Sequence, residues 1–176
     1  APWLASSSSP LLLSLLLLSK DPSILSRVLG CLQGMCHVAQ GRQAMRLEEN
    51  AMRRVLSLVM GGDASVRARA SGVIHNISID TQSIAVIREL GGIDIVISAL
   101  RDPSVEVSQA VAGTIQNLSR EVLCREMIMA QQQRVIGSLF ELVASGEVAC
   151  QVAAVGALMN LLPPSLGEEE QQQLQQ

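Results

Sequence analysis

Three asparagines recur at regular intervals in this sequence, each near the end of the same short motif. Residues 72–77, 113–118 and 156–161 all begin with glycine and end with asparagine followed by isoleucine or leucine. The asparagines are Asn76, Asn117 and Asn160. A side-chain amide offers both a hydrogen-bond donor and an acceptor, which is what a peptide unit requires. These amides could therefore hold the backbone of a partner, or they could cap or bridge neighbouring helices.

Residues able to carry catalysis or to bind a metal are few and scattered. The four cysteines form no CxxC pair, and the spacing of Cys31, Cys36 and His37 does not put them on one helical face. Neither His37 nor His75 has an acid, a base or a metal ligand as a partner in the sequence. No glycine-rich phosphate loop, pair of acids or nucleophile elbow is present. We therefore expect buried thiols in a reducing compartment, no metal, no cofactor and no enzymatic activity.

The motif also defines a period for the whole chain. Its leading glycines, Gly30, Gly72, Gly113 and Gly156, are 42, 41 and 43 residues apart, and the first copy has Gly34 in place of the asparagine. A period near forty is typical of stacked helical units that each contact only their neighbours. The sequence thus predicts an α-solenoid, a class of fold used for recognition more than for catalysis.

Hydrophobic periodicity and breaks predict three helices in most units. The expected helices are 11–19, 24–38, 43–50, 52–60, 66–78, 83–90, 93–100, 107–119, 123–131, 135–144 and 148–162. The repeats are expected at about 10–41, 42–82, 83–122 and 123–162, after a linker of residues 1–9 and before a disordered acidic and glutamine-rich tail of residues 163–176. Because the first repeat lacks its first helix, we expect the C-terminal piece of a longer protein.

Composition narrows the class of partner. The 176 residues carry a net charge of −3 and 16% charged side chains, against roughly 25% in an average soluble chain. Without a basic face there is no case for nucleic acid. The apolar run of residues 10–19 is too short to cross a bilayer and lacks the flanks of a secretory signal. We therefore expect no membrane partner and a cytoplasmic location, with nuclear or cytoskeletal sites as further options.

The order of these elements resembles the armadillo repeat family. A short helix, a double-glycine or polar turn, a second helix ending at a break such as 102–104, and a third helix with the signature A-x-G-x-[LI]-x-N-[LI] follow one another. The resemblance covers about residues 10–162, nearly four repeats. It departs from the pattern at Gly34 and at 145–146, where Ser-Gly replaces Asp-Pro. It implies an all-α fold, a right-handed α–α superhelix.

In this family the third helices line a concave groove in which asparagines bind the backbone of an extended peptide. The resemblance implies a ladder of Asn76, Asn117 and Asn160 along such a groove, with Arg69, His75, Gln109 and Gln116 beside it. Arg69 is the expected partner of a carboxylate. Nuclear import adaptors of this family carry tryptophan one turn before the asparagine. Glycine stands there in all three motifs of this chain, which disfavours an import receptor.

Two functions remain after this comparison. The leading hypothesis is a non-catalytic scaffold that binds an extended or helical segment of another protein along the groove, with no small-molecule substrate. The alternative is a structural or assembly module within a larger cytoskeletal, axonemal or chaperone-type protein, its groove filled or unused. Armadillo segments also follow tetratricopeptide repeats in co-chaperone and dynein-assembly proteins, and this chain could be such a segment.

Overall fold

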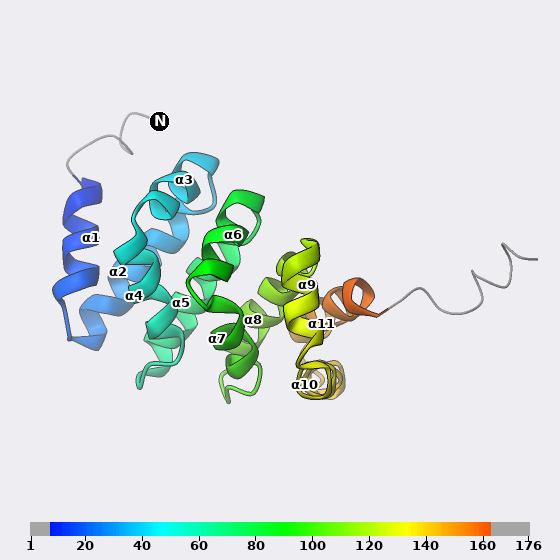
Figure 1. The fold of residues 1–176 in the computed structure, drawn as a ribbon. Coiled ribbons are helices and arrows are strands. Elements are labelled where there is room, and N and C mark those ends of the chain that lie inside the picture. Colours follow the sequence, from blue (N-terminus) through cyan, green and yellow to red (C-terminus); the bar gives the residue numbers. More distant parts are fainter. Residues whose placement is uncertain (1–7, 163–176) are drawn as a thin grey trace, which may run out of the picture.

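The computed structural model describes residues 8–162, and all regular secondary structure in that range is α-helical. The helices are α1 (Ser8–Leu18), α2 (Pro22–Met35), α3 (Ala39–Leu47), α4 (Glu49–Val59), α5 (Ala64–Ile77), α6 (Thr81–Glu89), α7 (Gly92–Ala99), α8 (Val105–Leu118), α9 (Val122–Met129), α10 (Gln132–Ala144) and α11 (Val148–Leu161). Figure 1 shows them stacked along one direction in chain order. The predicted tail, 163–176, and most of the predicted linker, 1–7, lie outside the described residues.

The helices group into four units. The first unit consists of α1 and α2, and each later unit has three helices, α3 to α5, α6 to α8 and α9 to α11. The third helices α2, α5, α8 and α11 pack against one another in sequence, and they make the most extensive contacts between units. This arrangement confirms the predicted all-α, right-handed α–α superhelix.

The breaks before α2, α5 and α8 act as helix N-caps. Asp21, Asp63 and Ser104 have extended backbones, and their side chains accept hydrogen bonds from backbone N–H groups at the starts of α2, α5 and α8. Pro22 lies in the first turn of α2, where a missing N–H breaks no helical hydrogen bond. A hydrogen bond from the serine two residues further on is the main reason why the pKa values of Asp21 and Asp63 lie below their ordinary value. Each of these corners is thus fixed by local chemistry.

The turn between α6 and α7 needs glycine at two successive positions. Gly91 has a φ of 72°, in the left-handed region that side chains disfavour. A Cβ on Gly92 would approach the backbone carbonyl and the side chain of Ile87 more closely than 3.0 Å. The double glycine therefore allows α7 to fold back tightly against α6.

The core is an aliphatic band that runs through all four units. Its fully buried members include Leu29, Leu32, Val73, Ile74, Ile77, Ile115, Leu118 and Leu139. Cys36, Cys124 and Cys150 are also buried, and burial raises the pKa of the Cys36 and Cys124 thiols to about 12. The expectation of buried thiols is confirmed for these three. It is wrong for Cys31, which is exposed because it lies at the edge of a surface pocket.

The largest departure from the expected helix boundaries is the start of α3, which begins at Ala39 and not at residue 43. Arg42 explains this early start, because its guanidinium donates 3.0 Å hydrogen bonds to the carbonyl oxygens of Cys36 and His37. These bonds provide partners for the carbonyl groups just after α2, so that α3 can begin soon after α2 ends. Likewise α1 begins at Ser8, inside the segment expected to be linker.

Ion pairs join each complete unit to the next. Arg46 and Asp80, Arg67 and Asp102, and Arg88 and Glu121 approach within 2.6, 2.7 and 3.0 Å. The second pair is the least exposed: its side chains are 15% and 10% accessible, and Arg67 donates to both carboxylate oxygens, from Nε at 2.7 Å and Nη2 at 3.3 Å. The hydrogen bond to Asp102 raises the pKa of Arg67. Because the two residues lie in successive units, this pair fixes the register of the stack.

A double-mutant cycle with Arg67→Gln and Asp102→Asn measures this coupling by urea unfolding. We expect a coupling free energy above the roughly 1 kcal/mol that bounds exposed pairs. The exposed pair Arg53 and Glu49 within α4, 57% and 64% accessible, is the control and should couple by less than about 0.5 kcal/mol. Equal coupling in both cycles would mean that the inter-unit pair does not hold the register.

Candidate functional site

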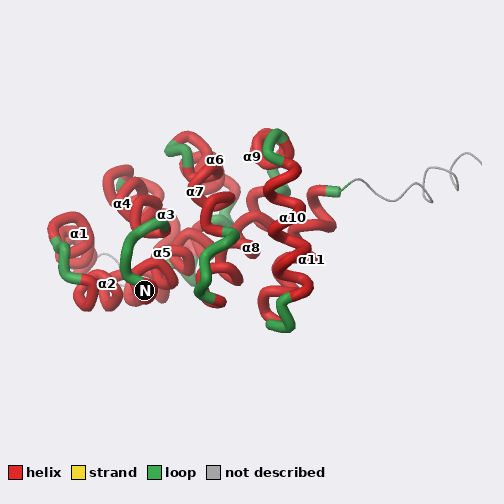
Figure 2. Tube along the Cα trace, turned by 90° about the horizontal axis from the view of Figure 1, so that it is seen from below, coloured by secondary structure: helices red, strands yellow, loops and turns green. Residues whose placement is uncertain are grey.

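The third helices line a continuous groove of about 1120 Å³. Its lining residues come from α2, α5, α8 and α11 and from the corner before α8. In Figure 2 these four helices follow one another along the length of the molecule. The groove surface is mixed, with small apolar residues beside polar ones and few charges. Its polar side chains are Ser26, Gln33, Ser65, Arg69, His75, Ser104, Glu106, Gln109 and Gln116.

Four of the predicted site residues line this groove. Arg69 and His75 reach it from α5, and Gln109 and Gln116 reach it from α8. Gln109 is exposed and Gln116 is partly buried. No hydrogen bond is recorded for either glutamine side chain among residues 8–162, so both amides are available to a ligand. Whether these four residues bind a partner stays a prediction.

The three asparagines are placed differently, because their amides turn towards the preceding unit. Asn76 Nδ2 donates to the carbonyl oxygen of Gln33 at 3.0 Å, and Asn160 Nδ2 donates to that of Gln116 at 2.9 Å. Asn117 Nδ2 donates to the hydroxyl of Ser78 at 3.0 Å. Asn76 and Asn117 are only 6% and 7% exposed. None of the three asparagines is among the residues that line the groove.

These hydrogen bonds meet a need of the helix ends. The last carbonyl groups of an α-helix have no partner within the helix. Gln33 lies in the last turn of α2 and Gln116 in the last turn of α8, and Ser78 is the C-terminal cap of α5. Each asparagine therefore secures the C-terminal end of the third helix in the preceding unit. This geometry matches the capping and bridging role that the sequence left open.

The groove floor is formed by a second row of side chains, the floor ladder. Its members, Gln33, His75 and Gln116, each stand one residue before the asparagine position of their motif. A Cβ on Gly72 would collide with the side chain of Gln33, one on Gly113 with the ring of His75, and one on Gly156 with the side chain of Gln116. Each motif glycine thus accommodates the side chain that precedes the asparagine position in the unit before it. Glycine has no Cβ and allows this close approach.

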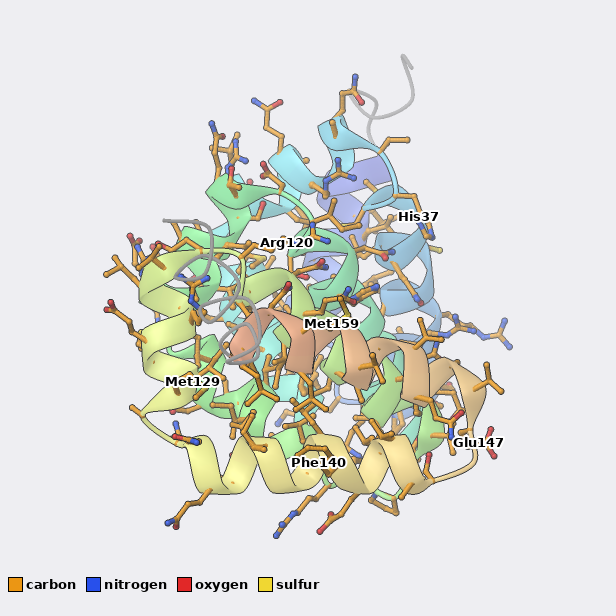
Figure 3. The ribbon with its side chains drawn as sticks, turned by 90° about the vertical axis from the view of Figure 1, so that its right-hand side faces the viewer. His37, Arg120, Met129, Phe140, Glu147 and Met159 are labelled. Carbon is orange, nitrogen blue, oxygen red and sulfur yellow. The ribbon has the colours of Figure 1, made fainter. Side chains whose placement is uncertain are left out.

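Sequence reasoning did not single out Gln33. It occupies the same motif position as His75 and Gln116, immediately before the asparagine slot, but it lies in the copy where Gly34 replaces the asparagine. The signal that would have found it is this alignment of the degenerate copy. Met159 holds the same position in α11 and is 76% exposed, since no further glycine covers it among residues 8–162. Figure 3 looks onto this end and labels Met159 and the exposed Phe140.

His75 is the titratable member of the floor ladder. Its Nδ1 is buried and has no hydrogen-bond partner in the described part of the chain. Desolvation, together with the nearby charge of His37, lowers the pKa of His75 below its ordinary value of 6.5. The neutral imidazole is therefore the form that the groove floor favours at pH 7.

Within residues 8–162 no three His, Cys, Asp or Glu side chains gather closely enough to hold a metal ion. None of the helices α1 to α11 combines the length and apolar character needed to cross a bilayer.

Comparison with known proteins agrees with this geometry. The family model described as Armadillo/beta-catenin-like repeat matches residues 80–120, which include α6 to α8. The chain is also 28% identical over 146 residues to Vacuolar protein 8 of Chaetomium globosum. The chain thus contains an armadillo repeat at residues 80–120 and is similar to an armadillo protein over most of its length. The second match covers 81% of this chain and 26% of the relative, so the chain spans about a quarter of that protein. Neither match supports the co-chaperone suggestion.

Solved structures of engineered and designed proteins have the same fold. An engineered protein superposes with a TM-score of 0.78 at 21% identity, covering 89% of this chain and 63% of the other. A protein computationally designed for modular peptide recognition gives 0.76 at 18% identity over 86% and 63%. A designed armadillo repeat protein in complex with the peptide (KR)4 gives 0.74 at 18% identity, with the same coverage.

Replacing the inward-facing asparagines should lower stability. We expect Asn76→Ala and Asn117→Ala each to reduce the free energy of unfolding by about 1–2 kcal/mol, because each loses a buried hydrogen bond between units. Urea unfolding followed by circular dichroism measures the change. Gln109→Ala, an exposed amide on α8, is the matched control and should change stability by less than about 0.5 kcal/mol. Unchanged unfolding in both asparagine variants would remove their structural role.

Acidification from pH 7 to pH 5 should destabilise the protein through His75. Its pKa is lowered in the folded state, so the unfolded chain takes up the proton first, and stability is lost as pH falls through the unfolded value near 6.5. His75→Gln places at this position the residue type found at Gln33 and Gln116. The variant should show a smaller loss of stability between pH 7 and pH 5, measured as urea unfolding midpoints at both pH values. Carboxylates with lowered pKa values, such as Asp63, respond only at lower pH. A variant as acid-sensitive as the wild type would contradict the assignment.

Proposed function

We propose that this chain is a non-catalytic interaction module that binds an extended segment of another protein along the groove of the third helices. The observation that carries the proposal is the groove itself, about 1120 Å³ in volume and lined by all four third helices. Its polar side chains, which include several serines and glutamines, suit a peptide main chain, which presents alternating donors and acceptors. We propose a cytoplasmic location for the same module.

Glutamines, and not the asparagines, are the proposed contacts to the partner backbone. The side-chain amides of Gln109 and Gln116 face the groove, and no hydrogen bond is recorded for them among residues 8–162. Asn76 and Asn117 are buried and already donate within the solenoid. An extended segment could thus hydrogen-bond to the glutamine amides while the asparagines keep the units in register.

The floor of the groove favours a narrow ligand. Where import adaptors of the family carry tryptophan, this chain has Gly72, Gly113 and Gly156, which are covered by Gln33, His75 and Gln116. These side chains leave no aromatic slots for long cationic stems. The designed structural neighbour that holds the peptide (KR)4 supports polypeptide binding to such a groove, and its basic ligand is not carried over to this chain.

Peptide display against the immobilised chain tests this function. Enriched peptides should bind the wild type and lose at least tenfold in affinity to Ala110→Trp, because Ala110 lines the middle of the groove and an indole there would block it. Ala130→Trp, an exposed alanine at the end of α9 outside the groove, is the control and should bind as the wild type does. Equal loss in both variants, or no enrichment, would leave the alternative structural role as the better account.

A further inference from the structure

Two arginines occupy the same register position in the first two units. Arg27 and Arg69 each stand three residues before the leading glycine of their motif, Gly30 and Gly72. The same position holds Ala110 in the third unit and Ala153 in the fourth. At this position the groove therefore carries two positive charges over α2 and α5. The same position carries no charge over α8 and α11.

The two arginines share one pocket. A hollow of about 490 Å³, next to the main groove, is lined by Ser26, Arg27, Gly30, Cys31 and Arg69. Ser26 and Arg69 also line the main groove, so the pocket opens onto it. Gly30 forms the floor of the pocket, and the Arg69 side chain passes over it. A Cβ on Gly30 would lie 3.8 Å from Nε of Arg69.

Neither guanidinium is neutralised by a carboxylate of the described chain. Within residues 8–162, Arg27 takes part in no ion pair or hydrogen bond, and Arg69 donates only to the neutral Oε1 of Gln33 at 3.2 Å. Elsewhere in residues 8–162 arginines do find carboxylates, namely Arg46, Arg53, Arg67, Arg88 and Arg101. The carboxylate that lines the main groove, Glu106, lies on α8 and accepts a hydrogen bond from Ser104.

We propose that Arg27 and Arg69 form a subsite for an anionic side chain of the bound segment. This inference rests on the proposed groove function and assigns that segment an acidic residue over α2 and α5. Two guanidinium groups offer planar pairs of N–H donors, which match the oxygens of a carboxylate or a phosphate. Ser26 adds a hydroxyl to the same pocket. The ligand is thus a polypeptide with an aspartate, glutamate or phosphorylated serine at this end and uncharged residues over α8 and α11.

Synthetic versions of the display-selected peptides test the subsite. At the position that is acidic in the selection, glutamate, phosphoserine, glutamine and lysine are compared by fluorescence anisotropy. With the wild type we expect glutamine to bind roughly tenfold more weakly than glutamate, the loss of a charge-assisted contact, and lysine more weakly still. If phosphoserine binds tighter than glutamate, a phosphorylated segment is the source of the anion; if it binds more weakly, the source is a carboxylate.

The variant Arg27→Ala/Arg69→Ala should erase the difference between glutamate and glutamine, whereas Arg120→Ala should retain it. Arg120, labelled in Figure 3, is exposed, and in the part of the chain that the structure describes it forms no ion pair and lines neither pocket. Adding Ala153→Arg to the double variant should move the preferred acid towards the other end of the peptide. Alanine and arginine have similar helix propensities, so folding should be preserved, and circular dichroism checks this.

Alkylation of Cys31 gives a second, independent readout. Cys31 borders the pocket and is exposed, whereas the other three cysteines are buried. Bound acidic peptide should slow its modification by N-ethylmaleimide severalfold, and the glutamine peptide should slow it less. Peptides that bind the groove without acidic preference, or leave Cys31 unprotected, would overturn the subsite while the groove function stands. A selection that enriches no peptide would overturn both.

Discussion

The close approach of neighbouring third helices is the constraint on which the rest of the structure depends. Each motif glycine lies beneath a side chain of the preceding unit, Gln33 over Gly72, His75 over Gly113 and Gln116 over Gly156. Glycine inside a helix costs roughly 1 kcal/mol relative to alanine, and tight packing between units compensates for it. The same contact sets the depth of the groove, since the overlying side chains are its floor.

This packing divides the polar side chains between two tasks. Residues that point between units are satisfied within the protein: Asn76 and Asn117 secure helix ends, and Arg67 reaches Asp102 in the next unit. Residues one helical step away face the groove with open hydrogen-bonding capacity, as Gln116 does. Cohesion and the proposed recognition are therefore assigned to adjacent residues of one motif, and a substitution at either position should have a distinct signature.

Much of the fold could be predicted from the sequence, because the glycine-to-asparagine motif recurs at a nearly constant period and its breaks carry their own caps, as at Asp63 and Ser104. The direction of the asparagines could not, since it depends on which acceptor at the end of the neighbouring helix lies within reach, a carbonyl oxygen for Asn76 and Asn160 and the Ser78 hydroxyl for Asn117. The early start of α3 depends on Arg42 reaching back to Cys36 and His37. Gln33 could not be recognised because Gly34 replaces the asparagine of its motif. Arg27 could not be assigned to a site because only the structure places it in the same pocket as Arg69.

The exposed Met159, with no glycine opposite it among the described residues, has a consequence for cooperativity. In a linear stack the free energy of the whole is close to a sum of unit terms and nearest-neighbour terms. Within residues 8–162 the α5–α8 junction has described neighbours on both sides, whereas α11 has one. In this stretch taken alone, opening should therefore propagate inward from the outer helices as fraying, with amide protection highest in α5 and α8. A ligand lying across all four third helices would act as a clamp that couples these local openings into a single transition.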